Sequence, residues 1–253
     1  MEENNLQNPE PSQISIAEIV SGVFYDPTNT YRAMLGSQKR NYWIICIVIS
    51  IALNLVSAFL FMNDAELVSE VKRLQKESVE KQINKSVEEG KLPQEKANEI
   101  IEQSEKNMEK FFALSSYGFS LLGPIILIFI PSLIYFLVLK ILKVQVDLMK
   151  IVNVVALAMV VFAVGSLLGT VLSIILGALG GFSLGTIISE VSIGKPAHLI
   201  LQKIDLFTLW YLFLITIGIK EAAGISKARS ASVVFGLWII WNIITIGGTL
   251  LFT

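Results

Sequence analysis

Five long stretches of uncharged, mostly apolar residues follow one another along this 253-residue chain. Crossing a hydrocarbon core of about 30 Å takes about 20 such residues in a helix. The pattern therefore predicts an all-α integral membrane protein with five transmembrane helices. The predicted spans cover residues 41–62, 112–139, 151–180, 204–220 and 230–252.

The segments between the spans complete the predicted organisation. A disordered tail precedes two amphipathic helices on the cytoplasmic side, and an external helical hairpin is inserted after the first span. In order, the tail, the helix pair, the first span, the hairpin and the remaining spans occupy residues 1–13, 14–40, 41–62, 63–111 and 112–253.

The third apolar stretch, residues 151–189, is too long for one simple span. As a single helix it would be about 58 Å long, nearly twice the hydrocarbon thickness. It either crosses once and continues into the membrane interface, or folds back at its glycines and crosses twice. The basic residues favour one crossing, because six spans would place Lys220, Lys227 and Arg229 outside, against the positive-inside rule. We therefore expect five spans, a cytoplasmic N-terminus and an external C-terminus.

The helix pair before the first span has clear boundary signals. Ser15 and Glu18 have the spacing of a capping box at the start of the first helix. Asp26 and Pro27 end that helix and start the second, because proline is favoured at the first helical position. One apolar stripe on the first helix consists of Ile16, Ile19, Val20, Val23 and Phe24. This stripe either packs on the protein's own cytoplasmic face, or anchors to the membrane surface or to a partner.

The inserted segment, residues 63–111, is charged and rich in helix-forming residues. Gly90 and Pro93 mark a turn in its middle. Its second half repeats apolar or small residues at heptad spacing, at Ala97, Ile101, Ser104, Met108 and Phe111. We expect a helical hairpin outside the membrane, which is either merely solvated or a surface for an extracytoplasmic partner.

Small residues recur at intervals of four within and after the third span. They are Gly165, Gly169, Ser173, Gly177, Gly181 and Gly185. On one continuous helix they would form a ridge that another helix could approach closely. The ridge predicts close packing within the protein, and homodimerisation is the alternative.

Composition narrows the chemistry further. The chain is 53% hydrophobic and 16% charged, with a mean hydropathy of +0.65 and a net charge of −1. It contains no cluster of Lys and Arg residues, so nucleic acid is not expected as a partner. It has one cysteine and one histidine, which excludes a disulfide framework and most metal or acid–base sites. No acidic or basic residue lies deep within a predicted span, so no proton relay or ion pathway is indicated.

One short motif is typical of a different class of protein. Gly181-Phe182-Ser183-Leu184-Gly185 matches the G-x-S-x-G nucleophile elbow of α/β-hydrolases. That elbow requires a preceding strand and an acid before the histidine, whereas here His198 precedes Asp205 and no strand pattern is present. We therefore expect no catalytic role for Ser183, no enzymatic activity, no metal and no cofactor.

Two segments resemble the Yip1 domain family of five-span membrane proteins. Gly22-Val23-Phe24-Tyr25-Asp26-Pro27 is similar to that family's GVF-x-x-P motif, and Asp205-Leu206-Phe207-Thr208-Leu209-Trp210 is similar to its D-x-F-x-x-W motif. Gly218-Ile219-Lys220 and Ser226-Lys227-Ala228 resemble its short basic turn before the last span. The resemblance covers residues 14–253, with the hairpin as an insertion. The Asp-Leu-Tyr-Gly-Pro motif of eukaryotic members is missing, which favours the bacterial branch and a bacterial cytoplasmic membrane.

The resemblance implies binding and organisation rather than catalysis. Eukaryotic members of the family bind prenylated Rab GTPases and shape membranes, and some bacterial members are encoded beside ABC-type exporters. The first hypothesis is a non-catalytic membrane scaffold or accessory subunit that contacts the lipid bilayer and other membrane proteins, with ABC exporter subunits among the candidates. The second is a lipid or small-solute transporter, which polar residues converging at mid-membrane would favour.

Overall fold

The computed structural model describes residues 15–37, 41–188 and 190–251, without the side chains of residues 109, 110 and 251. The predicted tail at residues 1–13 lies outside the described residues. Within them the chain is helical, and one isolated bridge joins Ser183 to Asp205. Five helices are long and apolar enough to cross a membrane, which confirms the predicted fold class.

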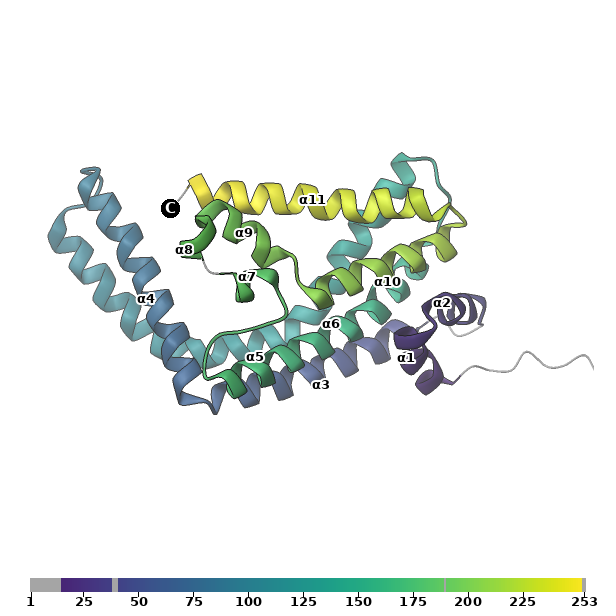
Figure 1. The fold of residues 1–253 in the computed structure, drawn as a ribbon, viewed down its shortest axis with the longest axis horizontal. Helices are drawn as coiled ribbons and strands as arrows, with labels where there is room; N and C mark the ends of the chain where they lie inside the picture. The colour runs from purple at the N-terminus through teal and green to yellow at the C-terminus, as the bar shows by residue number, and fades with distance from the viewer. Residues whose placement is uncertain (1–14, 38–40, 189, 252–253) are drawn as a thin grey trace, which may run out of the picture.

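The long helices lie side by side along the length of the molecule (Figure 1). The helices are α1 (Ile16–Tyr25), α2 (Pro27–Gly36), α3 (Tyr42–Met62), α4 (Ala65–Glu88), α5 (Gln94–Ile141), α6 (Leu148–Leu176), α7 (Leu184–Ile187), α8 (Glu190–Ile193), α9 (Lys195–Lys203), α10 (Leu206–Ala223) and α11 (Lys227–Leu251). We call the end that carries α1 and α2 the helix-pair end. The opposite end, where α4 and the start of α5 project, is the hairpin end.

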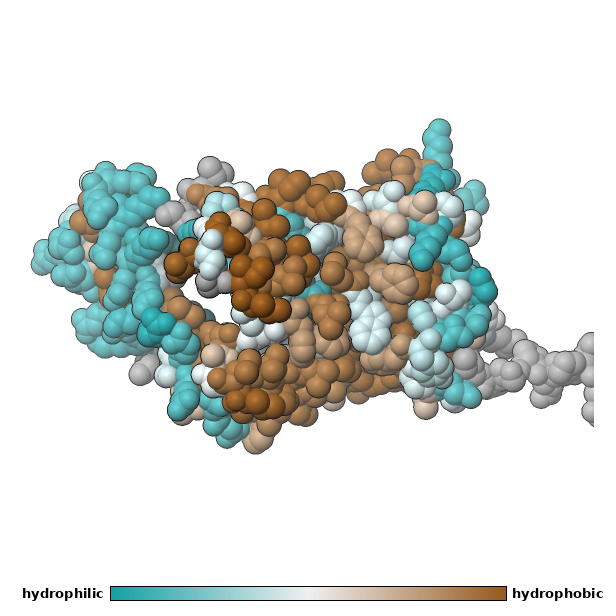
Figure 2. All heavy atoms as spheres, in the orientation of Figure 1, coloured by the Kyte–Doolittle hydropathy of each residue, from teal (hydrophilic) through white to brown (hydrophobic). Residues whose placement is uncertain are grey.

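Hydropathy divides the molecule into the same regions. In Figure 2 a hydrophobic band covers the middle of the visible face, and hydrophilic residues gather over the projecting hairpin and over the helix-pair end. An apolar band between two polar ends is the surface that a bilayer requires. The arrangement therefore fits a bundle that crosses the membrane along the long axis of the molecule.

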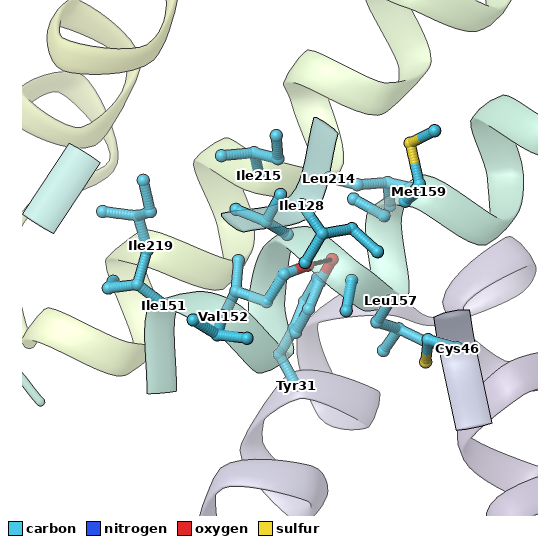
Figure 3. Packing of buried hydrophobic residues seen from close by; sticks show 14 of the residues in the cluster. Tyr31, Cys46, Ile128, Ile151, Val152, Leu157, Met159, Leu214, Ile215 and Ile219 are labelled. Carbon is cyan, nitrogen blue, oxygen red and sulfur yellow. Dashed lines mark hydrogen bonds between the residues drawn. The ribbon is translucent and has the colours of Figure 1, made fainter. Parts of the chain in front are cut away.

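The first half of α6 is the centre of the bundle. Its eleven consecutive residues from 151 to 161 are all buried, so no face of this segment meets solvent or lipid. Side chains from α2, α3, α5 and α10 surround it, and Figure 3 shows part of this packing. The one polar residue of the segment, Asn153, accepts a hydrogen bond from the backbone N–H of Trp43 at 2.9 Å. Asn153 therefore satisfies a donor at the start of α3 that would otherwise have no partner within that helix.

Two reciprocal glycine contacts hold α10 against α6. Gly218 of α10 faces the side chain of Val154 on α6, and Gly165 of α6 faces the ring of Phe207 on α10. A Cβ atom on either glycine would overlap the facing side chain. The two contacts lie eleven residues apart on both helices, from 154 to 165 and from 207 to 218. The antiparallel helices thus stay in register over about 16 Å, or three turns.

The prediction that the six small residues form a ridge on one continuous helix is wrong. The helix α6 ends at Leu176, because Gly177 adopts a left-handed conformation with φ of 62° and caps it. The described part of the predicted stretch therefore forms one candidate span, Leu148–Leu176, and the short helix α7; the short helices α8 and α9 follow before α10. Of the ridge residues, Gly165 packs against Phe207, and Gly169 has open space around it.

The remaining ridge residues make contacts within the chain after α6 ends. Ser173 binds the backbone of Gly180 twice, accepting from its N–H at 3.0 Å and donating to its carbonyl at 3.1 Å. Gly185 lies against α9, where a Cβ would come within 2.8 Å of the backbone nitrogen of Gln202. Gly181 contributes to the cleft described below. The homodimer alternative stays a prediction.

The predicted hairpin is not a separate unit from the second span. The sequence pattern placed a boundary between Phe111 and Phe112, whereas α5 runs without a break for 48 residues and includes Pro124 and Pro131. At 1.5 Å per residue this helix is about 72 Å long. The turn near Gly90 and Pro93 lies where the sequence predicted it, between α4 and α5.

Substitution of Gly218 tests the packing between α6 and α10. Gly218→Leu should destabilise the protein by roughly 1–3 kcal/mol, because overpacking forces Val154 and Tyr31 to move. Thermal unfolding in mild detergent measures the change. The matched control is Gly236→Leu in α11, where a Cβ meets open space. Equal unfolding temperatures for the two variants would contradict the proposed contact.

Candidate functional site

The helix pair is docked on the bundle by its apolar stripe. The capping box forms as predicted, because the Ser15 side chain accepts from the N–H of Glu18 and the Glu18 carboxylate accepts from the N–H of Ser15. Asp26 caps α2, and Pro27 occupies its first turn. Ile19 and Val23 are buried, and the other stripe residues, Ile16, Val20 and Phe24, pack against the same core. The protein's own bundle therefore covers the surface that the sequence offered to a partner.

Phe24 and Trp210 connect the two family motifs in space. Their rings lie 5.7 Å apart in an edge-on arrangement, although the residues are far apart in the sequence. Trp210 also stacks on Phe207, with ring centroids 6.1 Å apart. Such aromatic pairs contribute about 0.5–1.5 kcal/mol beyond the area they bury. The two short motifs are therefore parts of one contact between α1 and the start of α10.

The second helix of the pair is fixed by Tyr31 and Arg32. Tyr31 is fully buried against Gly218, and its hydroxyl donates to the backbone carbonyl of Val154 at 3.4 Å. Arg32 pairs with Glu221 at 2.9 Å, and the hydrogen bond to that carboxylate raises the pKa of the guanidinium. Gly22 makes a further close contact inside the pair, where a Cβ would overlap the side chain of Thr30. The motif glycines Gly22 and Gly218 are thus both sites of close approach.

A cleft opens on the hairpin side of this docked region. It has a volume of about 300 Å³ and lies between the second half of α6, the start of α10, α9 and the segment after Gly177. We call it the α6–α10 cleft. Its lining consists of Phe162, Gly165, Ser166, Gly169, Gly181, Phe182, Ser183, Gln202, Asp205, Phe207 and Thr208.

Asp205 is the charged residue of the cleft. One of its carboxylate oxygens accepts from the backbone N–H of Thr208 at 2.9 Å and so caps α10. Within the described ranges the carboxylate forms no ion pair with a lysine or an arginine. The hydroxyls of Ser166 and Thr208 also have no hydrogen-bond partner among the described residues. The cleft therefore offers a carboxylate oxygen and two hydroxyls to a ligand.

The α6–α10 cleft lies inside the bundle rather than at its end. Since Phe207 is level with Gly165, α6 continues for eleven further residues, to Leu176, beyond the start of α10. That length corresponds to about 16 Å. The segment between the two helices folds back over this distance, and Figure 1 shows α7, α8 and α9 beside the hairpin-side half of α11. Asp205 is the N-cap residue of α10 and stands directly before the candidate span Leu206–Ala223.

Ser183 lines the cleft, but the arrangement of a hydrolase does not form around it. Its hydroxyl lies 3.1 Å from the hydroxyl of Thr186. The ring nitrogens of His198 are engaged elsewhere, Nδ1 with the carbonyl of Ile188 at 2.9 Å and Nε2 with the side chain of Gln202 at 3.1 Å. Over the described ranges, no group of three His, Cys, Asp or Glu residues could hold a metal ion.

The sequence interpretation missed most of the cleft. It named Asp205 and Phe207 as motif residues, and Gly165, Gly169 and Gly181 as ridge residues, but not as the lining of one cavity. Phe182, Ser183 and Thr208 stood in the two quoted motif segments without a role in a cavity, and Phe162, Ser166 and Gln202 were not identified. One signal was present, because a fourth span much shorter than the third must begin at some depth in the bundle.

The fold and these contacts define an integral, multi-pass α-helical membrane protein. Its sequence matches the Yip1 domain over residues 21–248, and the chain therefore belongs to the Yip1 domain family. The match includes both motif segments that meet at Phe24 and Trp210. No curated protein and no solved structure matches the chain significantly.

A double-mutant cycle tests the contact between the two motifs. Phe24→Ala and Trp210→Ala should each lower the unfolding temperature in detergent, and the two effects should be coupled by about 0.5–1.5 kcal/mol. The coupling is expected because each single variant already removes the edge-on ring contact. Tyr25→Ala is the control, since Tyr25 is 76% exposed on the same helix. Purely additive effects of the Phe24 and Trp210 variants would show that the rings contribute independently.

Proposed function

We propose that this Yip1-family protein is a non-catalytic membrane scaffold that holds a partner outside the membrane through its helical hairpin. The observation that carries the proposal is the continuity of α5, which passes from the hairpin into the bundle without a break. A continuous helix carries the hairpin's direction into the bundle because no loop separates the two parts, and kinks are expected only at Pro124 and Pro131, which lie within the candidate span. The hairpin is therefore an arm with a fixed place on the bundle.

Contacts within the arm support its rigidity. Lys76 of α4 forms an ion pair with Glu105 of α5, which joins the two helices of the hairpin. The hydrogen bond that Lys76 donates to the Glu105 carboxylate, followed by the negative charge of that carboxylate, raises the pKa of the Lys76 ammonium group. Arg73 pairs with Glu70 and Glu77 along α4. Single exposed pairs contribute little energy, and of these pairs the one between Lys76 and Glu105 joins the two helices.

The surface of the arm has the composition of a partner-binding surface. Apolar side chains are exposed among its charges, with Leu74 at 42% and Ile100 at 43% of full exposure. A second cavity of about 450 Å³ lies between α4 and α5 and is lined by Gln75, Ser78, Val79, Ser104, Asn107, Met108 and Phe111. Mixed apolar and polar grooves of this kind suit a helix or loop of another protein.

We place the arm outside the cytoplasm on the distribution of basic residues. Lys220, Lys227 and Arg229 lie at the helix-pair end, together with Lys140 and Lys143. Positive charge favours the cytoplasmic side of a bacterial cytoplasmic membrane. The helix pair and the N-terminus would then be cytoplasmic, and the C-terminus would lie outside with the hairpin.

In this proposal the hairpin binds another membrane protein, or the extracytoplasmic domain of one. Subunits of an ABC-type exporter are one candidate, a membrane-organising complex is another, and a second copy of this chain is a third. A lipid or small-solute transporter is the alternative function. The scaffold is preferred because residues 151–161 of α6 are buried on every side, so the α6–α10 cleft does not continue to the helix-pair end along α6.

Site-specific photo-crosslinking tests the scaffold. A photoreactive residue at Ile100 on the arm should give a discrete protein adduct in intact cells, which mass spectrometry of the adduct identifies. The control position is Ile239 of α11, which is similarly exposed but lies in the apolar band. An adduct of two identical chains would make the protein its own partner. Absence of any arm adduct, with efficient crosslinker incorporation, would contradict the proposal.

Cysteine accessibility tests the orientation. Single cysteines replacing Glu88 and Lys227, in a Cys46→Ser background, should react differently with an impermeant maleimide added to intact cells. Glu88→Cys should be labelled from outside, and Lys227→Cys should be labelled only after permeabilisation, because the basic end is cytoplasmic. Labelling is read as a mass shift on a gel. External labelling at both positions would rule out the five-span orientation.

A further inference from the structure

We propose that the α6–α10 cleft binds the primary ammonium group of a phosphatidylethanolamine-type lipid. This inference does not depend on the scaffold function, because it concerns a different part of the molecule. It starts from Asp205, whose carboxylate lines the cleft with one oxygen engaged in capping α10 and no basic side chain paired with it among the described residues.

The charge of the lining selects a cation. Asp205 is the one ionisable residue among the residues that line the cleft, and no lysine, arginine or histidine belongs to that lining. A carboxylate in partly buried surroundings attracts a cation more strongly than it does in water, because the local dielectric constant is lower. Phosphatidylglycerol carries the same phosphate as phosphatidylethanolamine but has no ammonium group that could pair with this carboxylate.

The aromatic residues of the cleft favour an ammonium group over a metal ion. Phe162, Phe182 and Phe207 line it, and the rings of Phe182 and Phe207 lie 5.1 Å apart. Aromatic faces attract ammonium groups through their quadrupole and provide no oxygen ligands for Ca²⁺ or Mg²⁺. A lining with one carboxylate and several aromatic residues therefore fits an organic ammonium group better than a divalent metal ion.

The hydroxyl groups narrow the choice to a primary ammonium. Ser166 and Thr208 line the cleft, and within the described part of the chain their hydroxyls accept no hydrogen bond. A primary ammonium donates three hydrogen bonds, which the Asp205 carboxylate and these two hydroxyls can accept. A quaternary ammonium group has no N–H to donate, so these acceptors would stay unpaired.

The depth of the cleft indicates a lipid as the source of the ammonium group. The cleft lies at the level of Gly165, with about 16 Å of α6 between it and the hairpin end of that helix. Leu168 and Leu206, which are next in sequence to lining residues, are 44% and 58% exposed and belong to the candidate spans of α6 and α10. They provide an apolar path for acyl chains beside a polar site for the headgroup. A soluble amine would have to leave water for the same position.

Native mass spectrometry of the full chain tests the proposal. The protein, delipidated in detergent, is titrated with dioleoyl-phosphatidylethanolamine and separately with dioleoyl-phosphatidylglycerol. The wild type should retain one phosphatidylethanolamine at concentrations where phosphatidylglycerol is not retained. Asp205→Asn should weaken that retention by about tenfold, which corresponds to the loss of one desolvated charge–ammonium contact.

Matched variants separate binding from folding. Asparagine caps helices as well as aspartate does, so Asp205→Asn removes the charge and keeps the start of α10. Asp147→Asn makes the same change at the cap of α6, away from the cleft, and should leave retention unchanged. Gly169→Leu fills the cleft at a position where a Cβ has open space, and should also abolish retention. Unfolding temperatures in lipid-free detergent show whether each variant is folded.

The outcomes decide both the site and the source of its ligand. Two results together support a lipid headgroup in the cleft. The Asp205→Asn and Gly169→Leu variants lose retention of phosphatidylethanolamine, and the wild type keeps the lipid in the presence of excess O-phosphoethanolamine. Displacement of the lipid by O-phosphoethanolamine supports the same ammonium site with a soluble ligand as its occupant. Equal retention of the two lipids, or unchanged retention in both folded variants, would overturn the proposal.

Discussion

The close contact between α6 and α10 is the constraint on which the rest of the structure depends. Val154 fits against Gly218 and Phe207 fits against Gly165, and the equal spacing of the two pairs fixes both the register and the direction of the helices. In a bilayer, helices gain no hydrophobic free energy by associating with each other, so close packing at small residues supplies much of the attraction. The helices α1, α2, α3, α5 and α11 dock on this pair, and Tyr31 of α2 contacts Gly218.

The register of α6 and α10 also creates the cleft. The helix α10 has 18 residues, whereas α6 has 29. Because Gly218 of α10 packs against Val154 of α6, the first turn of α10 lies beside the middle of α6 rather than beside its end. Backbone that is not helical is tolerated at such depth only where protein covers it or where it lines a cavity. The segment after Gly177 meets this requirement through Ser173, which binds the backbone of Gly180. Asp205 then caps a helix whose first turn lies inside the bundle.

Local signals in the sequence predicted the local structure well. The five spans, the capping box of Ser15 and Glu18, the Asp26–Pro27 junction and the hairpin turn all depend on neighbouring residues, and all are present. The ridge of small residues failed because spacing alone does not show that Gly177 would adopt a positive φ and end the helix. The contact between Phe24 and Trp210, and the gathering of the cleft residues, depend on the packing of distant helices, which no local pattern encodes.

The helix pair and the cleft both contact the helix α10, so the position of α10 affects both. Trp210 contacts Phe24 of α1 and stacks on Phe207, which lines the cleft, while Gly218 farther along α10 contacts Tyr31 of α2. A shift of α10 along its axis would have to break both glycine contacts together, since they lie on one helix with a fixed spacing. Ring contacts at Trp210 connect Phe207, which lines the cleft, to Phe24 of α1, with centroid distances of 6.1 and 5.7 Å. The aromatic residues of the two family motifs therefore form one continuous contact from the cleft to the helix pair.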